Sequence, residues 1–189
     1  MYAASVTDPL GRPVKAAYGI VRSGGVKTAV MEMSAASGLP LLLPDELNPW
    51  ITSTYGTGEM ISDALNRGCR KFLVGIGGSA TNDAGTGMLS ALGVRFLDSR
   101  GQRLKGCGKD LESIARIDMS SLIPAARESE FIVACDVNTP FCGPDGAARV
   151  FAPQKGADPQ TAEALDRGMR SFAGVIAGQF QTDIVPLSG

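Results

Sequence analysis

The chain has 189 residues, of which 44% are hydrophobic and 20% are charged. This length and composition are typical of one globular domain that is stable without disulfides. A net charge of −1 and the lack of a long basic cluster argue against binding to nucleic acid or to an anionic membrane. No apolar segment has the length of a membrane span. We therefore expect a soluble protein whose partners are small molecules or other proteins.

The chain contains no histidine. This absence excludes Ser-His-Asp and Cys-His catalysis and removes the commonest transition-metal ligand, so any acid–base chemistry must use carboxylates or lysine. The four cysteines have no C-x-x-C spacing and follow no secretory signal, which predicts reduced, mostly buried thiols in a cytoplasmic protein. They are Cys69, Cys107, Cys135 and Cys142.

The chain is predicted to open as an antiparallel meander. Residues 2–7 and 14–21 have strand-like sequences and flank a turn rich in proline and glycine. A second turn at Gly24 and Gly25 precedes residues 26–33, whose side chains alternate in character. This alternation predicts a third strand.

A helix is predicted to follow, with Thr57 as its N-cap and Gly68 at its end. Glu59 would lie in the first turn, where a negative charge is favourable. The residues of the apolar face are Met60, Ile61, Ala64 and Leu65. The start of this helix is either a capped surface position or a ligand-contacting N-terminus.

A glycine-rich stretch from Gly75 to Gly87 connects an apolar strand at 72–74 to a helix that is predicted to end at Gly93. Its polar residues are Ser79, Thr81, Asn82 and Asp83. A plain connection needs only one capping residue, so this stretch is predicted to let a ligand contact the backbone. The alternative is a tight connection that needs glycine only for its dihedral angles.

Two further strands are predicted. Residues 94–97 follow the helix and would complete a parallel β-α-β unit. Residues 130–135 have the composition of a buried strand and lead to Asp136 and Asn138. Polar groups at the end of a buried strand occupy a favoured site position in α/β sheets.

The last predicted element is a helix that begins at Asp158 and Pro159, with an apolar stripe that packs on the core. Together the elements predict an α/β fold of three layers with a mixed sheet, in which the N-terminal antiparallel meander is followed by β-α-β units. Residues 1–189 are expected to form a single domain.

The glycine stretch was compared with two nucleotide-binding motifs. It lacks the Gly-Lys-Ser/Thr end of a P-loop. Residues 75–80 do fit G-x-G-x-x-A after a strand, and Asp98 follows at a tolerable distance, so a dinucleotide-binding domain is the main alternative. Against it, residues 81–83, Gly85 and Gly87 prolong the loop where a dinucleotide-binding helix should already have begun.

The residues resemble a known family, the bacterial class I glycerate kinases. The resemblance is carried by residues 75–87 and 91–98 around the glycine stretch, and by residues 54–59, 134–144 and 151–157. These motifs occur in the right order and extend over nearly the whole chain.

The resemblance implies transfer of the γ-phosphoryl group of ATP to D-glycerate, with Mg²⁺ as a second cofactor. The family has two α/β domains with a cleft between them, one domain being inserted in the other. The family's Asp-Ser-Phe-Lys-Gly-type motif has no counterpart before Met1, and its C-terminal motifs would follow Gly189. The chain is therefore expected to correspond to the inserted domain and its borders. Expected partners are D-glycerate and a nucleotide, with a second copy of the chain or a complementing fragment as protein partners.

The catalytic candidates are Asp83, Asp136 and Lys155. Asp83 would orient the attacking hydroxyl or the metal, Asp136 would join Asn138 in an oxygen-rich wall, and Lys155 would neutralise phosphate charge. The residues expected to bind substrate or phosphate are Gly77, Gly78, Ser79, Thr81, Asn82, Asn138 and Thr57. No metal ligands are assigned.

Each of these candidates has a structural alternative. Asp83 would then only cap its helix, Asp136 and Asn138 would form an Asx turn, and Lys155 would be solvated. For the whole chain, the alternatives to glycerate kinase activity are a dinucleotide-binding oxidoreductase domain and a non-catalytic binding or assembly fragment.

Overall fold

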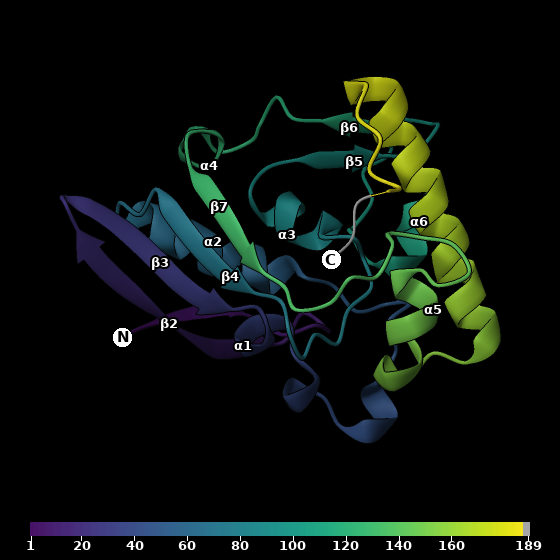
Figure 1. The fold of residues 1–189 in the computed structure, drawn as a ribbon, viewed down its shortest axis with the longest axis horizontal. Coiled ribbons are helices and arrows are strands. Elements are labelled where there is room, and N and C mark those ends of the chain that lie inside the picture. Colours follow the sequence, from purple (N-terminus) through teal and green to yellow (C-terminus); the bar gives the residue numbers. More distant parts are fainter. Residues whose placement is uncertain (187–189) are drawn as a thin grey trace.

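The computed structural model describes residues 1–186 and has an α/β fold with two sheets (Figure 1). The larger sheet has the strand order β1-β2-β3-β4-β7, and the smaller consists of β5 and β6. The strands are β1 (Tyr2–Thr7), β2 (Pro13–Ser23), β3 (Val26–Glu32), β4 (Lys71–Gly75), β5 (Arg95–Leu97), β6 (Arg116–Asp118) and β7 (Glu130–Ala134). The large sheet lies on one side of the molecule, and β5 and β6 lie on the other.

Helices connect most of these strands. They are α1 (Ser34–Ser37), α2 (Tyr55–Asn66), α3 (Thr86–Ala91), α4 (Pro124–Arg127), α5 (Ala147–Phe151) and α6 (Pro159–Phe180), with 3₁₀ turns η1 (Leu39–Leu41), η2 (Pro44–Glu46), η3 (Gly108–Ser113) and η4 (Pro153–Lys155). The predicted start of α6 is confirmed, because the Asp158 side chain accepts a hydrogen bond from the Thr161 N–H at 2.7 Å. No described helix is both long and apolar enough to cross a membrane.

The α/β class with a mixed sheet is confirmed. Strands β1, β2 and β3 form the predicted antiparallel meander. Strands β3, β4 and β7 then run parallel, with Val30, Leu73 and Ile132 in register. The segment from β3 through α2 to β4 is therefore a β-α-β unit.

The prediction of a parallel β-α-β unit after the glycine stretch is wrong. Strand β5 pairs antiparallel with β6, opposite to the expected parallel pairing with β4. Both edges of β4 are already occupied, by β3 and by β7. The chain after α3 therefore leaves the large sheet and forms the small sheet.

The predicted N-cap of α2 is also wrong. The helix begins at Tyr55 with Thr54 as its N-cap, one turn earlier than expected. Thr57 is 1% exposed, and its hydroxyl is hydrogen-bonded to that of Ser37 at 2.7 Å. The earlier start follows from tertiary contacts of Thr54, which local sequence signals do not reveal.

Strand β7 is an exposed edge strand, although its sequence predicts a buried one. Its side chains Phe131, Ile132 and Val133 are 40%, 52% and 55% exposed. Helices α1 and α2 pack on one face of the sheet, and Leu73 is 37% exposed on the opposite face. Among residues 1–186, helices therefore pack on one face of the large sheet.

Two clusters of buried side chains form the core. The first lies between the large sheet and α2 and includes Tyr18, Met60 and Phe72. The second joins β5, β6, η3 and α6 and includes Phe96 and Leu165. Residues 1–186 thus contain two core clusters, and the glycine stretch runs between them.

Gly58→Ala should destabilise the fold although alanine is the better helix former. A Cβ at Gly58 would lie too close to the carbonyl oxygen of Met88 and 2.7 Å from Cβ of Ala91. We expect a loss of about 2 kcal/mol in the free energy of unfolding, measured with urea. Gly174→Ala is the control, because no atom lies within 4 Å of its Cβ position in α6; it should add about 0.5–1 kcal/mol. Equal effects of the two changes would contradict the packing of α2 on α3.

Candidate functional site

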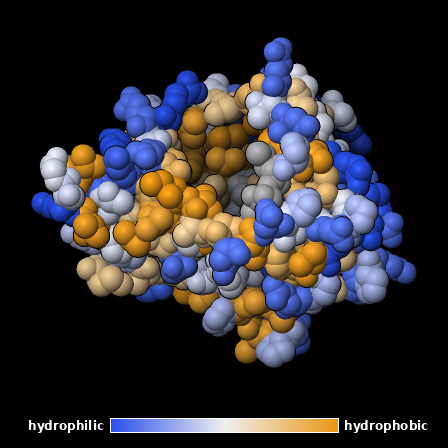
Figure 2. All heavy atoms as spheres, in the orientation of Figure 1, coloured by the Kyte–Doolittle hydropathy of each residue, from blue (hydrophilic) through white to orange (hydrophobic). Residues whose placement is uncertain are grey.

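A cavity of about 580 Å³ opens between the two core clusters. Figure 2 shows this hollow beside the surface over β7, with apolar side chains on its wall. Its polar wall includes Thr54, Thr57, Gly77, Gly78, Ser79, Thr81, Asn82, Asp83, Asp136, Gln154 and Lys155. Most of the polar residues predicted from the sequence therefore meet at one cavity.

The glycine stretch forms the floor of this cavity and is held by the segment that follows α1. The Gly78 carbonyl accepts a hydrogen bond from the Leu39 N–H, and the Ala80 N–H donates to the Ser37 carbonyl, both at 2.9 Å. Gly78 has a φ of +68°, which favours glycine. Within residues 1–186, neither Gly77 nor Gly78 donates its N–H to another group. These two N–H groups are therefore free to bind an anion.

Asp83 is 2% exposed, and its carboxylate accepts four hydrogen bonds. The backbone N–H and the hydroxyl of Thr54 donate to Oδ2 at 2.8 Å each, and the Gly87 N–H does so at 3.2 Å. The Gly85 N–H donates to Oδ1 at 3.1 Å. Burial raises the pKa of Asp83, and these hydrogen bonds from Thr54, Gly85 and Gly87 oppose that effect. The carboxylate thus joins the starts of α2 and α3.

Lys155 is 7% exposed, and its ammonium group points at the glycine stretch. Nζ donates to the Ser79 hydroxyl at 2.8 Å and to the Thr81 carbonyl at 2.6 Å. None of the ion pairs found among residues 1–186 includes Lys155. Burial lowers the pKa of Lys155 to about 8, although the charge of Asp83 opposes this shift. An anion in the cavity would supply the missing negative charge.

The remaining residues of the stretch are fixed by the protein. Ser79 and Thr81 serve as acceptors for Lys155, as described above. The Asn82 side-chain amide donates to the sulfur of Met169 in α6 at 3.3 Å. Asn82 therefore anchors the stretch to the second core cluster and lines the cavity with the rest of its surface.

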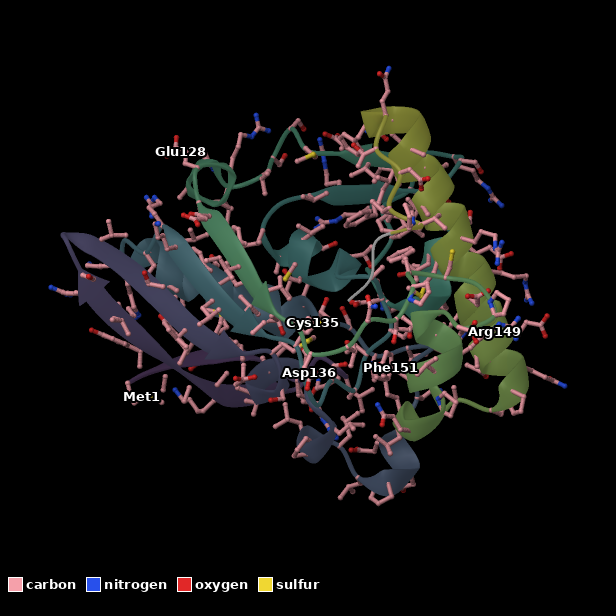
Figure 3. All side chains as sticks on the ribbon, in the orientation of Figure 1. Met1, Glu128, Cys135, Asp136, Arg149 and Phe151 are labelled. Carbon is pink, nitrogen blue, oxygen red and sulfur yellow. The ribbon has the colours of Figure 1, made fainter. Side chains whose placement is uncertain are left out.

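Of the other predicted site residues, Asp136 and Thr57 line the cavity and Asn138 does not. Asp136 and Cys135 follow the end of β7, and both line the cavity together with Phe151 of α5 (Figure 3). Thr57 lines the cavity, but its hydroxyl is paired with Ser37. Asn138 is exposed and is not among the cavity-lining residues. The structure thus brings Asp136 to the cavity and does not bring Asn138 there.

Several cavity residues were not among the predicted site residues. Thr54 and Gln154 belong to the segments that carry the family resemblance, so a signal for them was present. The apolar residues Phe141 and Phe151 also belong to those segments, whereas Met33, which lies between β3 and α1, does not. No local pattern distinguishes Met33 from an ordinary core residue.

The cysteines are all free, and three are buried as expected: Cys69, Cys107 and Cys142. Cys135 is exposed at the cavity. Among residues 1–186 there is no group of three His, Cys, Asp or Glu side chains that could hold a metal ion.

The model of the glycerate kinase family matches residues 1–189. The chain is 49% identical over 168 residues to glycerate kinases of Haemophilus influenzae and Bacillus subtilis, which covers 89% of this chain and 44% of each relative. It is 43% identical over 184 residues to the glycerate 2-kinase of Escherichia coli, covering 97% of this chain and 48% of that protein. The chain thus spans about half the length of the curated relatives it matches.

A solved structure is similar over the whole chain. It is described as a putative glycerate kinase 2 from Salmonella typhimurium LT2, with a TM-score of 0.94 and 44% sequence identity. The match covers 100% of this chain and 50% of that one.

Thr54→Val should destabilise the protein strongly. The Thr54 hydroxyl donates a hydrogen bond to the Asp83 carboxylate and accepts one from the Met88 N–H, both at 2.8 Å. Valine has no hydroxyl, so the carboxylate and the Met88 N–H would each lose a partner. We expect a loss of about 3 kcal/mol in the free energy of unfolding. The control is Thr52→Val, which removes one neutral hydrogen bond to the Ala80 carbonyl and should cost about 1 kcal/mol. Similar losses for the two variants would contradict a central role for the Asp83 contact.

Proposed function

Because the chain belongs to the glycerate kinase family, we propose that it forms one wall of a site in which the γ-phosphoryl group of ATP is transferred to D-glycerate. The observation that carries this proposal is the buried ammonium group of Lys155, which has no carboxylate partner among residues 1–186 and faces a glycine stretch with two free N–H groups. This arrangement supports the binding of a small anion.

In the proposed site, Lys155 and the N–H groups of Gly77 and Gly78 bind either the carboxylate of glycerate or a phosphoryl oxygen. Asp83 holds the stretch in place, and its Oδ1, which has one protein donor, accepts a hydrogen bond from a substrate hydroxyl. Phosphoryl transfer depends mainly on positioning and on stabilising charge. A site without histidine can therefore supply what the reaction needs.

Magnesium would be held mainly by the phosphate groups of ATP. Mg²⁺ is commonly bound by one or two carboxylates together with substrate phosphates. Asp136 is exposed at the cavity and fits the role of such a carboxylate. The ion would neutralise phosphate charge at the mouth, while Lys155 does so at the floor.

The dinucleotide-binding alternative is weakened by the position of Asp98. This residue was expected to reach the ribose at the end of a neighbouring parallel strand. Instead it follows β5 in the small sheet, and its Oδ1 accepts hydrogen bonds from the N–H groups of Arg100 and Gln102. Asp98 is also not among the cavity-lining residues.

The affinity of the chain for D-glycerate should depend on the protonation of Lys155. Because burial lowers its pKa to about 8, affinity should be constant below that pH and fall above it as the ammonium group loses its proton. A bound anion favours the protonated form, so binding should take up protons near pH 8. Calorimetric titration in two buffers of different ionisation enthalpy measures both effects.

Two variants serve as controls for this titration. Lys155→Met should remove the pH dependence together with most of the affinity. Lys109→Met changes an exposed lysine outside the cavity lining and should keep the wild-type profile. An affinity that stays the same from about pH 7 to about pH 9.5 would contradict the role of Lys155.

The proposed reaction is tested by measuring ADP release that depends on D-glycerate, with ATP and Mg²⁺ present. The assay is run with this chain alone and with the unmatched segments of a curated relative supplied in trans. In the active assembly, Lys155→Met should lower kcat/KM by about 100-fold, which corresponds to about 2.7 kcal/mol. A loss below about tenfold would remove Lys155 from the site. NADH fluorescence that changes on addition of the chain would favour the dinucleotide alternative.

A further inference from the structure

A second cavity, of about 590 Å³, lies apart from the candidate site. Its lining residues lie within 7–11, 51–55 and 103–107, together with Ser90 of α3. The first segment is the turn between β1 and β2, the next leads into α2, and the last precedes η3. None of these lining residues also lines the cavity of the candidate site.

Hydrogen bonds of Ser53 hold the walls of the second cavity together. The Ser53 N–H donates to the Pro9 carbonyl at 3.0 Å, and the Ser53 hydroxyl donates to the Gly106 carbonyl at 2.6 Å. One residue before α2 thus connects the turn at 7–11 to the segment at 103–107. The second cavity is therefore preformed, as ligand sites usually are.

The lining carries two cations that have no acidic partner. Arg103 and Lys105 are exposed there, and none of the ion pairs among residues 1–186 includes either of them. The acidic lining residue, Asp8, is 6% exposed, and its carboxylate accepts hydrogen bonds from the Leu10 N–H and from the backbone and side chain of Arg12. Asp8 is thus already neutralised by Arg12. An anion in the second cavity would meet positive charge that no described carboxylate compensates.

A buried hydroxyl of the lining also lacks a partner. Ser90 is 5% exposed, and its hydroxyl oxygen forms no hydrogen bond within residues 1–186. Buried polar side chains are mostly paired, because an unpaired one costs free energy. The Thr7 hydroxyl of the same lining shows the usual state, since it donates to the Glu59 carboxylate at 2.8 Å. A ligand oxygen in the second cavity would give Ser90 the partner that the described residues do not supply.

The apolar part of the lining indicates the rest of the ligand. Ile51 and Tyr55 both line the second cavity, and their side chains are 44% and 38% exposed. An aromatic ring packs favourably on such side chains, and on tyrosine most of all. The volume of about 590 Å³ is also much larger than a small inorganic anion requires and suits an organic ligand.

We propose that the second cavity binds an organic phosphate with an aromatic body. The phosphate contacts Arg103 and Lys105, because a planar guanidinium and an ammonium group both bind phosphate oxygens well. The aromatic body packs against Ile51 and Tyr55, and an oxygen of the ligand pairs with the Ser90 hydroxyl. This site is separate from the cavity proposed for phosphoryl transfer, and the proposal does not depend on that reaction.

The probe for this site is phenyl phosphate, which combines a phosphate with an aromatic ring. The isotope-labelled 189-residue chain is titrated with it and followed by NMR, without ATP or glycerate and in a buffer free of phosphate. We expect the amide chemical shifts of residues 7–11, 51–55 and 103–107 to change together. Inorganic phosphate should bind there at least about tenfold more weakly, because it has no ring to bury.

Two double variants form a matched pair. Arg103→Ala with Lys105→Ala should weaken the binding of phenyl phosphate by at least about tenfold, since both charged contacts are lost. Arg100→Ala with Lys109→Ala removes the same two charges from exposed positions outside the lining and should leave the affinity unchanged. Circular dichroism verifies the fold of each variant, and the shift map of the wild type needs no variant.

Ser90→Ala separates a ligand contact from a structural role. The Ser90 hydroxyl has no hydrogen bond to lose within residues 1–186, so the free chain should keep its midpoint of unfolding in urea. The affinity for phenyl phosphate should nevertheless fall by about threefold, since one hydrogen bond to the ligand is removed. A lower midpoint together with an unchanged affinity would contradict the proposed role of Ser90.

Three results would overturn the site itself. The shifts change at residues 75–87 and not at the lining of the second cavity, or the Arg103 and Lys105 double variant binds phenyl phosphate as tightly as the wild type does. Alternatively, inorganic phosphate binds as tightly as phenyl phosphate, which would exclude the aromatic body. Lys155→Met should leave this binding unchanged, so these results are separate from any failure of the kinase assay.

Discussion

The buried carboxylate of Asp83 and its four hydrogen-bond donors hold the candidate site together. A buried charge is costly unless it is fully hydrogen-bonded. Thr54 supplies two of the donors from the start of α2, and Gly85 and Gly87 supply the others around the start of α3. Any movement of either helix start would leave the charge with fewer partners. The glycine stretch is thereby fixed at its C-terminal end, and its shape is set by a polar contact between segments distant in sequence.

Lys155 fixes the same stretch from the other core cluster. It bonds to Ser79 and to the Thr81 carbonyl, while Asp83 bonds to α2 and α3, so the two opposite charges act on different parts of the backbone. Because Lys155 forms no ion pair with Asp83, no carboxylate contacts its ammonium group, and burial lowers the pKa of Lys155 to about 8. A direct Lys–Asp pair would satisfy both charges and would have little attraction for a ligand. The observed arrangement instead leaves Lys155 without a carboxylate partner among residues 1–186, which supports the proposed binding of an anion.

Sequence reasoning predicts the features that local chemistry determines. The meander, the glycine stretch and the Asp158 cap of α6 follow from turn residues, alternation and capping rules, and all are present. Long-range contacts determine the features that it misses. Strand β5 pairs with β6 because both edges of β4 are filled, and α2 begins at Tyr55 because Thr54 bonds to Asp83. The polar residues of the cavity were predicted from the sequence, whereas an apolar lining residue such as Met33 has no local sequence signal.

The polar groups of the cavity floor have their partners within residues 1–186, whereas one apolar face of the large sheet is partly exposed. The hydrogen bonds that shape the cavity floor, those of Asp83 and Lys155, lie wholly within residues 1–186. The large sheet, whose strand β4 leads into this floor, leaves Val30, Leu73 and Ile132 partly exposed on one face, and the half exposure of Ile132 leaves about 1 kcal/mol of burial unused. The geometry of the glycine stretch therefore does not require a covering partner. The stability of the sheet would gain from one, because Val30, Leu73 and Ile132 still have apolar surface to bury.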